Sequence, residues 1–127
     1  MDIKVRYHEC DMQRVVYNAH YLTYCDEAMS AWLGEAFGWS GADDDFDWML
    51  VRAEIDWQGS ATFGDVVTVE MGVERWGTTS FVTRFVGTIG GRPCFAAGIT
   101  YVCVEPGSTA KMAVPDHVRA GLGLAPD

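Results

Sequence analysis

Long stretches of the chain alternate between apolar and polar residues, the pattern of β-strands that bury one face. The alternation predicts five strands, at residues 2–8, 49–58, 66–75, 80–89 and 93–104. The last two flank Gly90-Gly91, and a glycine pair between two apolar runs is typical of a tight hairpin. Residues 76–79 are expected to form the turn between the predicted strands 66–75 and 80–89, so the strands should pair in an antiparallel sheet. Within the second predicted strand, the apolar positions that alternate with polar ones are Met49, Val51, Ala53, Ile55 and Trp57.

One segment, from about residue 19 to residue 37, has helical spacing instead. Its apolar stripe consists of Leu22, Cys25, Met29, Trp32 or Leu33, and Ala36. Asn18 is a favourable N-cap residue, and Gly38 is suited to end the helix. A shorter helical turn is predicted from Pro115 to about Gly121, after which the tail is expected to fray.

The order of elements predicts an α+β fold with a five-stranded antiparallel sheet and one long helix on a single face. One helix covers little of such a sheet. The remaining apolar area, which includes five tryptophans, therefore predicts burial against a second subunit.

Length and composition indicate one globular domain, residues 1–127, with 49% hydrophobic and 21% charged residues. No run of apolar residues is long enough to span a membrane. The N-terminus lacks a basic region followed by an apolar run, which argues against a signal peptide and predicts a cytoplasmic protein. The four cysteines lack metal-ligand spacing and are expected to be reduced and mostly buried: Cys10, Cys25, Cys94 and Cys103.

The net charge of −9 and the absence of a basic run argue against nucleic acid as a partner. Four acids crowd into one segment, at Asp43, Asp44, Asp45 and Asp47. This acidic run is expected to be a solvated loop, and its spacing does not indicate a metal site.

The candidate chemistry lies just before the long helix, where Asp11 precedes Asn18 by seven residues. The peptide N–H groups of a first helical turn have no intrahelical partners. They could hold a carbonyl oxygen as it gains negative charge, while Asp11 attacks the carbon or activates a water. A loop aspartate more often hydrogen-bonds its own backbone, so the residues around Asp11 decide between the two interpretations.

Those residues form the pattern Arg-x4-Asp-x3-Val-Val-Tyr-x3-Tyr, made by Arg6, Asp11, Val15, Val16, Tyr17 and Tyr21. With this pattern the chain resembles the hot-dog-fold acyl-CoA thioesterases of the 4-hydroxybenzoyl-CoA thioesterase family, from Val5 to about Glu105. The resemblance implies a curved sheet wrapped around the helix and subunits that pair their sheets into homodimers or homotetramers. It also implies active sites at subunit interfaces, with no metal and no bound cofactor.

In the resemblance, Asp11 aligns with the family's catalytic aspartate, and the backbone amide near Asn18 aligns with the group that polarises the thioester carbonyl. The candidate catalytic residues are therefore Asp11, Tyr17 and Asn18. Two positions depart from the family pattern. Arg14 stands where the family often has glycine, and arginine fits poorly if the loop needs a positive φ there. Asn18 replaces a histidine or tyrosine.

Coenzyme A phosphates need local positive charge on a protein this acidic. The candidate substrate-binding residues are Arg14, His20, Tyr21, Arg75, Arg84 and Arg92, although each arginine could equally belong to a solvated face. Asp26 and Glu27 compete with Asp11 as the catalytic carboxylate. The aromatic residues that could line an acyl pocket, or equally form core or interface, are Trp48, Trp57, Phe63, Phe81 and Phe85.

The predicted activity is hydrolysis of an acyl-CoA thioester to a free acid and coenzyme A. Two alternatives stay open: a non-catalytic acyl-CoA-binding module, and a hydratase or dehydratase of the same fold, in which His20 would have to act as the catalytic histidine. The acyl group, an acyl-carrier-protein substrate, and the choice between base and nucleophile for Asp11 are also open.

Overall fold

The computed structural model describes residues 1–39 and 45–122. Asp43 and Asp44 of the acidic run, and the tail expected to fray, lie outside the described residues. The elements in chain order are β1 (Asp2–Lys4), the 3-10 turn η1 (Tyr7–Glu9), α1 (His20–Phe37), β2 (Asp47–Trp57), β3 (Val66–Trp76), β4 (Ser80–Ile89), β5 (Arg92–Val104) and α2 (Asp116–Gly121).

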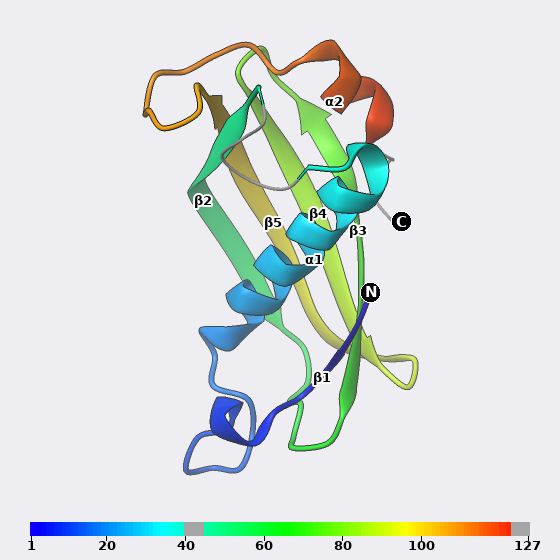
Figure 1. Ribbon diagram of the computed structural model, residues 1–127. Coiled ribbons are helices and arrows are strands. Elements are labelled where there is room, and N and C mark those ends of the chain that lie inside the picture. The colour runs from blue at the N-terminus through cyan, green and yellow to red at the C-terminus, as the bar shows by residue number, and fades with distance from the viewer. Residues whose placement is uncertain (40–44, 123–127) are drawn as a thin grey trace.

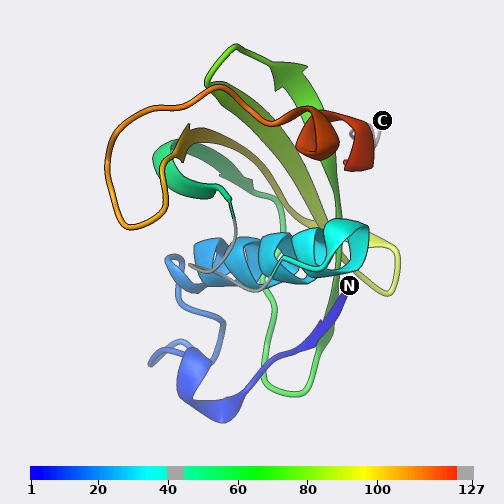
Figure 2. The ribbon, with the colours of Figure 1, turned by 45° about the horizontal axis from the view of Figure 1, so that its top comes forward.

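The strands form one antiparallel sheet with the order β1-β3-β4-β5-β2 (Figure 1). The sheet curls around one side of α1, and α2 lies at the end of the molecule opposite the loop that precedes α1 (Figure 2). The expected sheet and single long helix are confirmed. Among the described residues, neither helix has the length and apolar character that crossing a bilayer requires.

The predicted strand at residues 2–8 is wrong in its second half. Of the predicted strand, only β1 is paired, with β3, because the chain turns into η1 after Arg6. The Arg6 N–H donates to the Glu9 carboxylate over 2.7 Å, and the Glu9 N–H donates to the Arg6 carbonyl over 3.1 Å. These local hydrogen bonds replace the ladder that a longer strand would need.

Helix α1 ends as predicted, at Gly38, which has the left-handed φ of 69° and donates its N–H to the Gly34 carbonyl. The expected N-cap is wrong. Ala19 occupies that position and has no capping side chain, so Asn18 lies one residue too early. The helix buries a wider face than predicted, made of Tyr21, Tyr24, Cys25, Ala28, Met29 and Leu33, whereas Ala36 is exposed.

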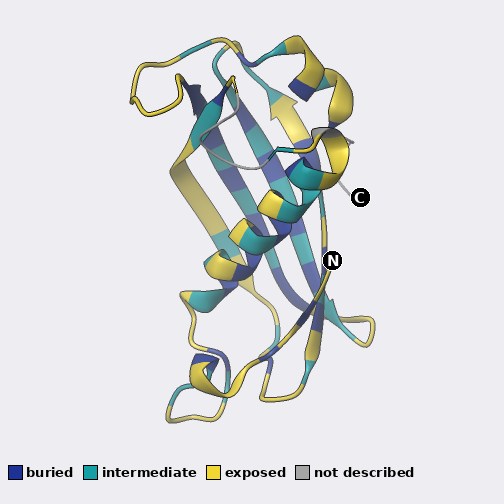
Figure 3. Cartoon of the chain, in the orientation of Figure 1, coloured by how far each residue is buried: buried dark blue, intermediate teal, exposed yellow. Residues whose placement is uncertain are grey.

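Strand β2 is largely exposed, in contrast to the half-buried strand that its alternation predicts (Figure 3). As the edge strand beside β5, it extends past the face that α1 covers. A register shift between Leu50 and Arg52 also moves the apolar residues between faces, since Met49 pairs with Val102 but Ala53 pairs with Ile99. Asp47, expected in a solvated loop, is the first residue of this strand.

The expected glycine turn, the mostly buried cysteines and the helical turn after Pro115 are confirmed. Gly90 and Gly91 turn the β4–β5 hairpin with φ of 56° and 84°. The cysteines are free thiols, with Cys10 half-buried and the other three buried. Pro115 precedes α2, whose Arg119 lies 5.3 Å from the centre of the Trp76 ring and attaches the helix to the β3–β4 turn.

Candidate functional site

Residues 10–16 form a small hairpin before α1. Cys10 and Val16 make an antiparallel bridge, and the Asp11 N–H donates to the Val15 carbonyl over 2.9 Å. The Arg14 N–H closes the turn on the Asp11 carbonyl over 3.0 Å. The turn from Asp11 to Arg14 is of a kind that typically ends in one residue with a left-handed backbone. In this hairpin that residue is Arg14, with φ of 65°. The positive φ considered for this position is therefore present, in a residue that pays a steric cost for it.

The Asp11 side chain is half-buried within this hairpin. Its Oδ1 accepts the Gln13 N–H over 2.8 Å, which is the local backbone contact common for loop aspartates. In the part of the chain that the structure describes, Oδ2 accepts no hydrogen bond. One oxygen therefore orients the carboxylate, and the other stays available to a reactant.

Asp11 faces an open hollow of about 520 Å³ lined by Tyr7, Cys10, Asp11, Arg14, Thr62 and Phe63. Tyr7 and Phe63 meet edge to face, with ring centres 6.1 Å apart, and both rings are mostly exposed. The hollow therefore combines a carboxylate, a guanidinium and an apolar wall.

The start of α1 provides the second part of the site. The Tyr17 N–H is occupied, because it donates to the Glu9 carbonyl over 3.0 Å. Within the described ranges, the Asn18 N–H donates to no protein group. Asn18 lines a smaller hollow beside the Asp11 hairpin, together with Val15, Val16, Tyr21, Trp57, Gln58, Gly59 and Ser60. An amide with no partner at a helix start is suited to accept a developing negative charge.

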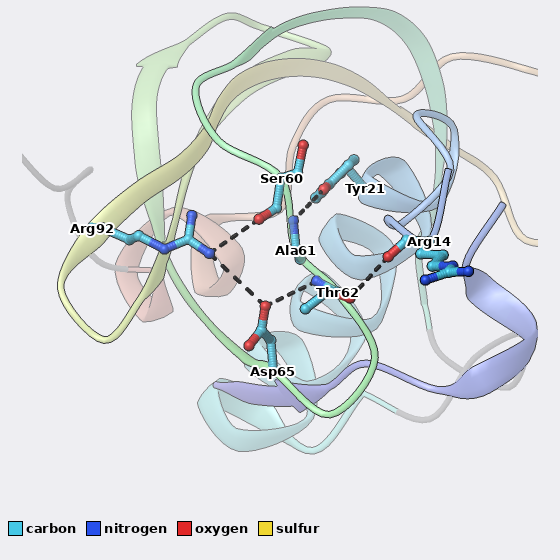
Figure 4. Close-up of polar contacts among 7 residues, drawn as sticks. All are labelled: Arg14, Tyr21, Ser60, Ala61, Thr62, Asp65 and Arg92. Carbon is cyan, nitrogen blue, oxygen red and sulfur yellow. Dashed lines mark hydrogen bonds and ion pairs between the residues drawn. The ribbon is translucent and has the colours of Figure 1, made fainter. Parts of the chain in front are cut away.

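The segment from Ser60 to Asp65 lies beside the hairpin and is bonded to it (Figure 4). The Thr62 hydroxyl donates to the Arg14 carbonyl over 2.8 Å, and the Val16 N–H donates to the Ala61 carbonyl over 2.9 Å. Asp65 accepts the Thr62 N–H over 2.9 Å. The left-handed residue and the second strand of the hairpin are thus both attached to this segment.

Two predicted substrate-binding residues turn out to hold that segment in place (Figure 4). The Arg92 guanidinium donates to the Ser60 carbonyl over 3.1 Å and lies 3.9 Å from Asp65. The Tyr21 hydroxyl is buried and accepts the Ala61 N–H over 3.2 Å. Burial raises the pKa of Tyr21, which keeps the phenol neutral.

The other predicted binding residues lie in two places. His20 stays close to the site, where its ring meets Tyr17 edge to face at 6.0 Å. Arg75 and Arg84 lie on the sheet face turned away from α1, so a single chain does not bring them together with Asp11. Arg84 is flanked there by two glycines, Gly72 and Gly98.

The competing carboxylates lie on α1. Partial burial raises the pKa of Asp26, and Glu27 is half-buried. Neither lines the two hollows beside the Asp11 hairpin. Of the aromatic candidates, Phe81 and Phe85 belong to the core, whereas Trp57 and Phe63 are exposed at the hollows.

Sequence reasoning missed Glu9, Tyr24 and Thr62. Glu9 is 5% exposed although it is charged, and Tyr24 is fully buried. Glu9 stands at an unspecified position of the motif, between Arg6 and Asp11, and nothing local predicts the burial of a glutamate. Thr62 reaches the hairpin across 48 residues of sequence, a contact that no local pattern encodes.

Known proteins resemble this chain in sequence over most of its length. The chain matches the profile of the thioesterase-like superfamily over residues 5–122. It is 26% identical to the 1,4-dihydroxy-2-naphthoyl-CoA hydrolase of Trichodesmium erythraeum (strain IMS101), in an alignment covering 93% of this chain and 90% of that protein. It is also 26% identical to the long-chain acyl-CoA thioesterase FadM of Escherichia coli (strain K12), with 94% and 93% covered.

A solved structure from the thioesterase superfamily of Jannaschia sp. CCS1 superposes with a TM-score of 0.89 at 28% identity. The superposition covers 96% of this chain and 88% of that one. This likeness confirms the hot-dog fold.

Proposed function

The chain belongs to the thioesterase-like superfamily, and from this membership we propose that it hydrolyses an acyl-CoA thioester to a free acid and coenzyme A. The observation that carries the proposal is the Asp11 hairpin beside the start of α1. This hairpin carries a carboxylate with one available oxygen, and the chain continues from it into the start of α1, where the Asn18 N–H is unpaired within the described residues. The two named relatives, a hydrolase and a thioesterase of CoA esters, support the same chemistry.

In the proposed reaction, the Asn18 N–H donates to the thioester oxygen as the carbonyl carbon becomes tetrahedral. Asp11 takes a proton from the attacking water through Oδ2, and Oδ1 stays bound to the Gln13 N–H. The C–S bond then breaks, and the departing thiolate recovers the proton from Asp11. Direct attack by Asp11 to give a mixed anhydride uses the same geometry. An oxyanion donor of this kind contributes about 3–4 kcal/mol to lowering the barrier.

The proposal gives the nearby residues distinct parts. The Tyr17 N–H is occupied, so only its exposed ring, beside His20, can contact the substrate. Arg14 is exposed at the rim of the Asp11 hollow and is the basic group best placed there for a phosphate. Arg75 and Arg84 would reach a substrate only from another subunit, which fits the proposed homodimer or homotetramer.

The test is release of free thiol from a panel of acyl-CoAs, from short aliphatic to aromatic, with wild type and Asp11→Asn in parallel. We expect turnover in the wild type and a loss of about 100- to 10,000-fold in the Asn variant, the range for a lost acid–base group. Substrate binding should persist in the variant. Asp116→Asn is the matched control, because that exposed carboxylate lies on α2 at the other end of the molecule.

Three results would contradict the proposal in different ways. Tight acyl-CoA binding without thiol release would indicate a binding module. Addition of water to an enoyl-CoA, without free acid, would indicate a hydratase and direct attention to His20. Full activity in Asp11→Asn would move the chemistry to Asp26 or Glu27.

A further inference from the structure

We propose that Glu9 is a positioning residue that holds the Asp11 hairpin against α1, an inference that rests on the proposed thioesterase function for its catalytic consequence. Glu9 is 5% exposed, and within the described ranges no other acidic or basic side chain is buried. Burying a carboxylate is costly unless hydrogen bonds replace its hydration. A buried glutamate therefore indicates hydrogen bonds that an apolar side chain such as leucine could not make.

The contacts of Glu9 come from three different parts of the chain. Its Oε1 accepts the Arg6 N–H over 2.7 Å and the Tyr24 hydroxyl over 3.1 Å. Its backbone carbonyl accepts the Tyr17 N–H over 3.0 Å. Glu9 therefore joins the segment after β1, the second turn of α1 and the residue that precedes Asn18.

Tyr24 is suited to be the fixed end of this attachment. It is fully buried on α1, and its ring meets Tyr21 edge to face at 5.9 Å. Burial raises the pKa of Tyr24, and the nearby Glu9 carboxylate raises it further. The phenol therefore stays protonated and donates a hydrogen bond to Glu9.

The two ends of the Asp11 hairpin are thus attached to the same helix by separate routes. Cys10, at the first end, follows Glu9 and is held through the Tyr24 hydroxyl. Val16, at the second end, is held through Ala61, whose N–H donates to the Tyr21 hydroxyl. Removing the Glu9 carboxylate would release one end only, so the hairpin would persist while Asp11 would sample positions away from the reacting carbon. A misplaced catalytic group lowers kcat more than it weakens binding.

The kinetic test compares Glu9→Ala, Glu9→Gln, Tyr24→Phe and the double variant Glu9→Ala/Tyr24→Phe. We expect kcat to fall about 10- to 100-fold in Glu9→Ala with KM within about threefold of wild type, following the sensitivity of catalysis to small misplacements. Glu9→Gln, which keeps an acceptor oxygen of the same reach, should recover most of the rate. The double variant should be no slower than Glu9→Ala, because both changes break one interaction.

Val73→Ala controls for lost stability, since Val73 is buried in β3, near the strand end where Trp76 contacts Arg119 of α2. It should lower the urea midpoint and leave kcat unchanged at a temperature where all variants are folded. The proposal is overturned if Glu9→Ala loses no more kcat than Val73→Ala, or if its KM rises as much as its kcat falls.

Amide hydrogen exchange provides a readout that does not depend on catalysis. The Asp11 and Gln13 N–H groups both donate within the hairpin, so Glu9→Ala should speed their exchange while Val73→Ala should not. If the wild type hydrolyses no thioester, the proposed function fails, yet the exchange rates still decide whether Glu9 holds the hairpin. Unchanged exchange in Glu9→Ala would overturn the positioning role.

Discussion

At the scale of single residues, Arg14 shows how the Asp11 hairpin is stabilised despite its sequence. Its φ of 65° is a left-handed conformation that glycine adopts freely and arginine does not. The Thr62 hydroxyl, bound to the Arg14 carbonyl over 2.8 Å, helps to hold that conformation. Because the Arg14 side chain is exposed beside Asp11, the effect of its charge and the effect of its backbone conformation can be tested separately.

Replacing Arg14 should separate these two properties. We expect Arg14→Gly to raise the free energy of unfolding by about 0.5–1 kcal/mol, because it removes the steric cost of a positive φ. Arg14→Ala keeps that cost and should leave stability near the wild-type value. Both variants should raise KM for acyl-CoA if the guanidinium meets a phosphate. Urea unfolding and steady-state kinetics measure the two effects, and Gln13→Gly, with no positive φ to relieve, should bring no gain.

The cysteines differ in their accessibility. Burial raises the pKa of Cys25 to about 12 and that of Cys103 to about 11, and it also raises the pKa of Cys94. The thiolate is the reactive form, so at pH 8 these three thiols should react only when the protein unfolds. Half-buried Cys10 lines the Asp11 hollow and should react first.

A thiol titration with a disulfide reagent at pH 8 tests this order. We expect one fast thiol per chain, and three more after urea is added. Cys10→Ser should abolish the fast phase alone. Rapid reaction of any thiol in the folded Cys10→Ser variant would contradict the burial of the other three.

At the scale of elements, the β4–β5 hairpin determines how closely α1 can approach the sheet. Gly87 pairs with Phe95, and the Phe95 ring lies over the glycine in the space that a Cβ would occupy. The same ring packs on Tyr21, with centres 5.4 Å apart. Gly87 thus leaves room for the Phe95 ring, whose contact with Tyr21 joins the sheet to α1.

Gly87→Ala should therefore be destabilising by about 1–3 kcal/mol, the usual cost of overpacking a core. The added methyl would push Phe95 toward Tyr21. Gly98→Ala is a matched control on β5, because a Cβ there meets no atom within 4 Å. Urea unfolding of the two variants measures the difference. Equal stability would show that the Phe95 ring can move away without cost.

At the scale of the whole molecule, the edge strand β2 is the largest departure from a self-contained core. Met49, Leu50, Val51 and Trp57 are 43–57% exposed, and β2 pairs only with β5 among the described strands. An exposed apolar edge of this kind favours pairing with another chain. Trp57 also lines the hollow beside Asn18, so a partner seated on β2 would lie next to the site.

We therefore expect the chain to sediment as a homodimer or homotetramer, well above the 14.0 kDa of one copy. Leu50→Glu should shift the protein toward the single-chain mass, because it places a charge where apolar surface would be buried. Thr109→Glu, in the exposed loop after β5, should not. Analytical ultracentrifugation measures both, and a wild type that sediments as one chain at micromolar concentration would rule out this use of β2.

The sequence by itself determined the features that depend on neighbouring residues. The period-two runs located β3, β4 and β5 within one or two residues, and Gly38 and the Gly90-Gly91 pair stop and turn the chain as expected. The family resemblance, through the glycine common at position 14, also raised the question of a positive φ at Arg14. Periodicity and turn chemistry act over a few residues, so one chain suffices to read them.

Only the tertiary structure decided which residues are buried and what each polar group contacts. It exposed β2, placed the bulge that moves Met49 away from the face of Ala53, and buried Glu9 against Tyr24. It also showed that Arg92 and Tyr21 both contact the segment 60–65, which is attached to the Asp11 hairpin. Burial and partner choice arise from contacts between residues tens of positions apart, and their free energies depend on geometry that no local pattern contains.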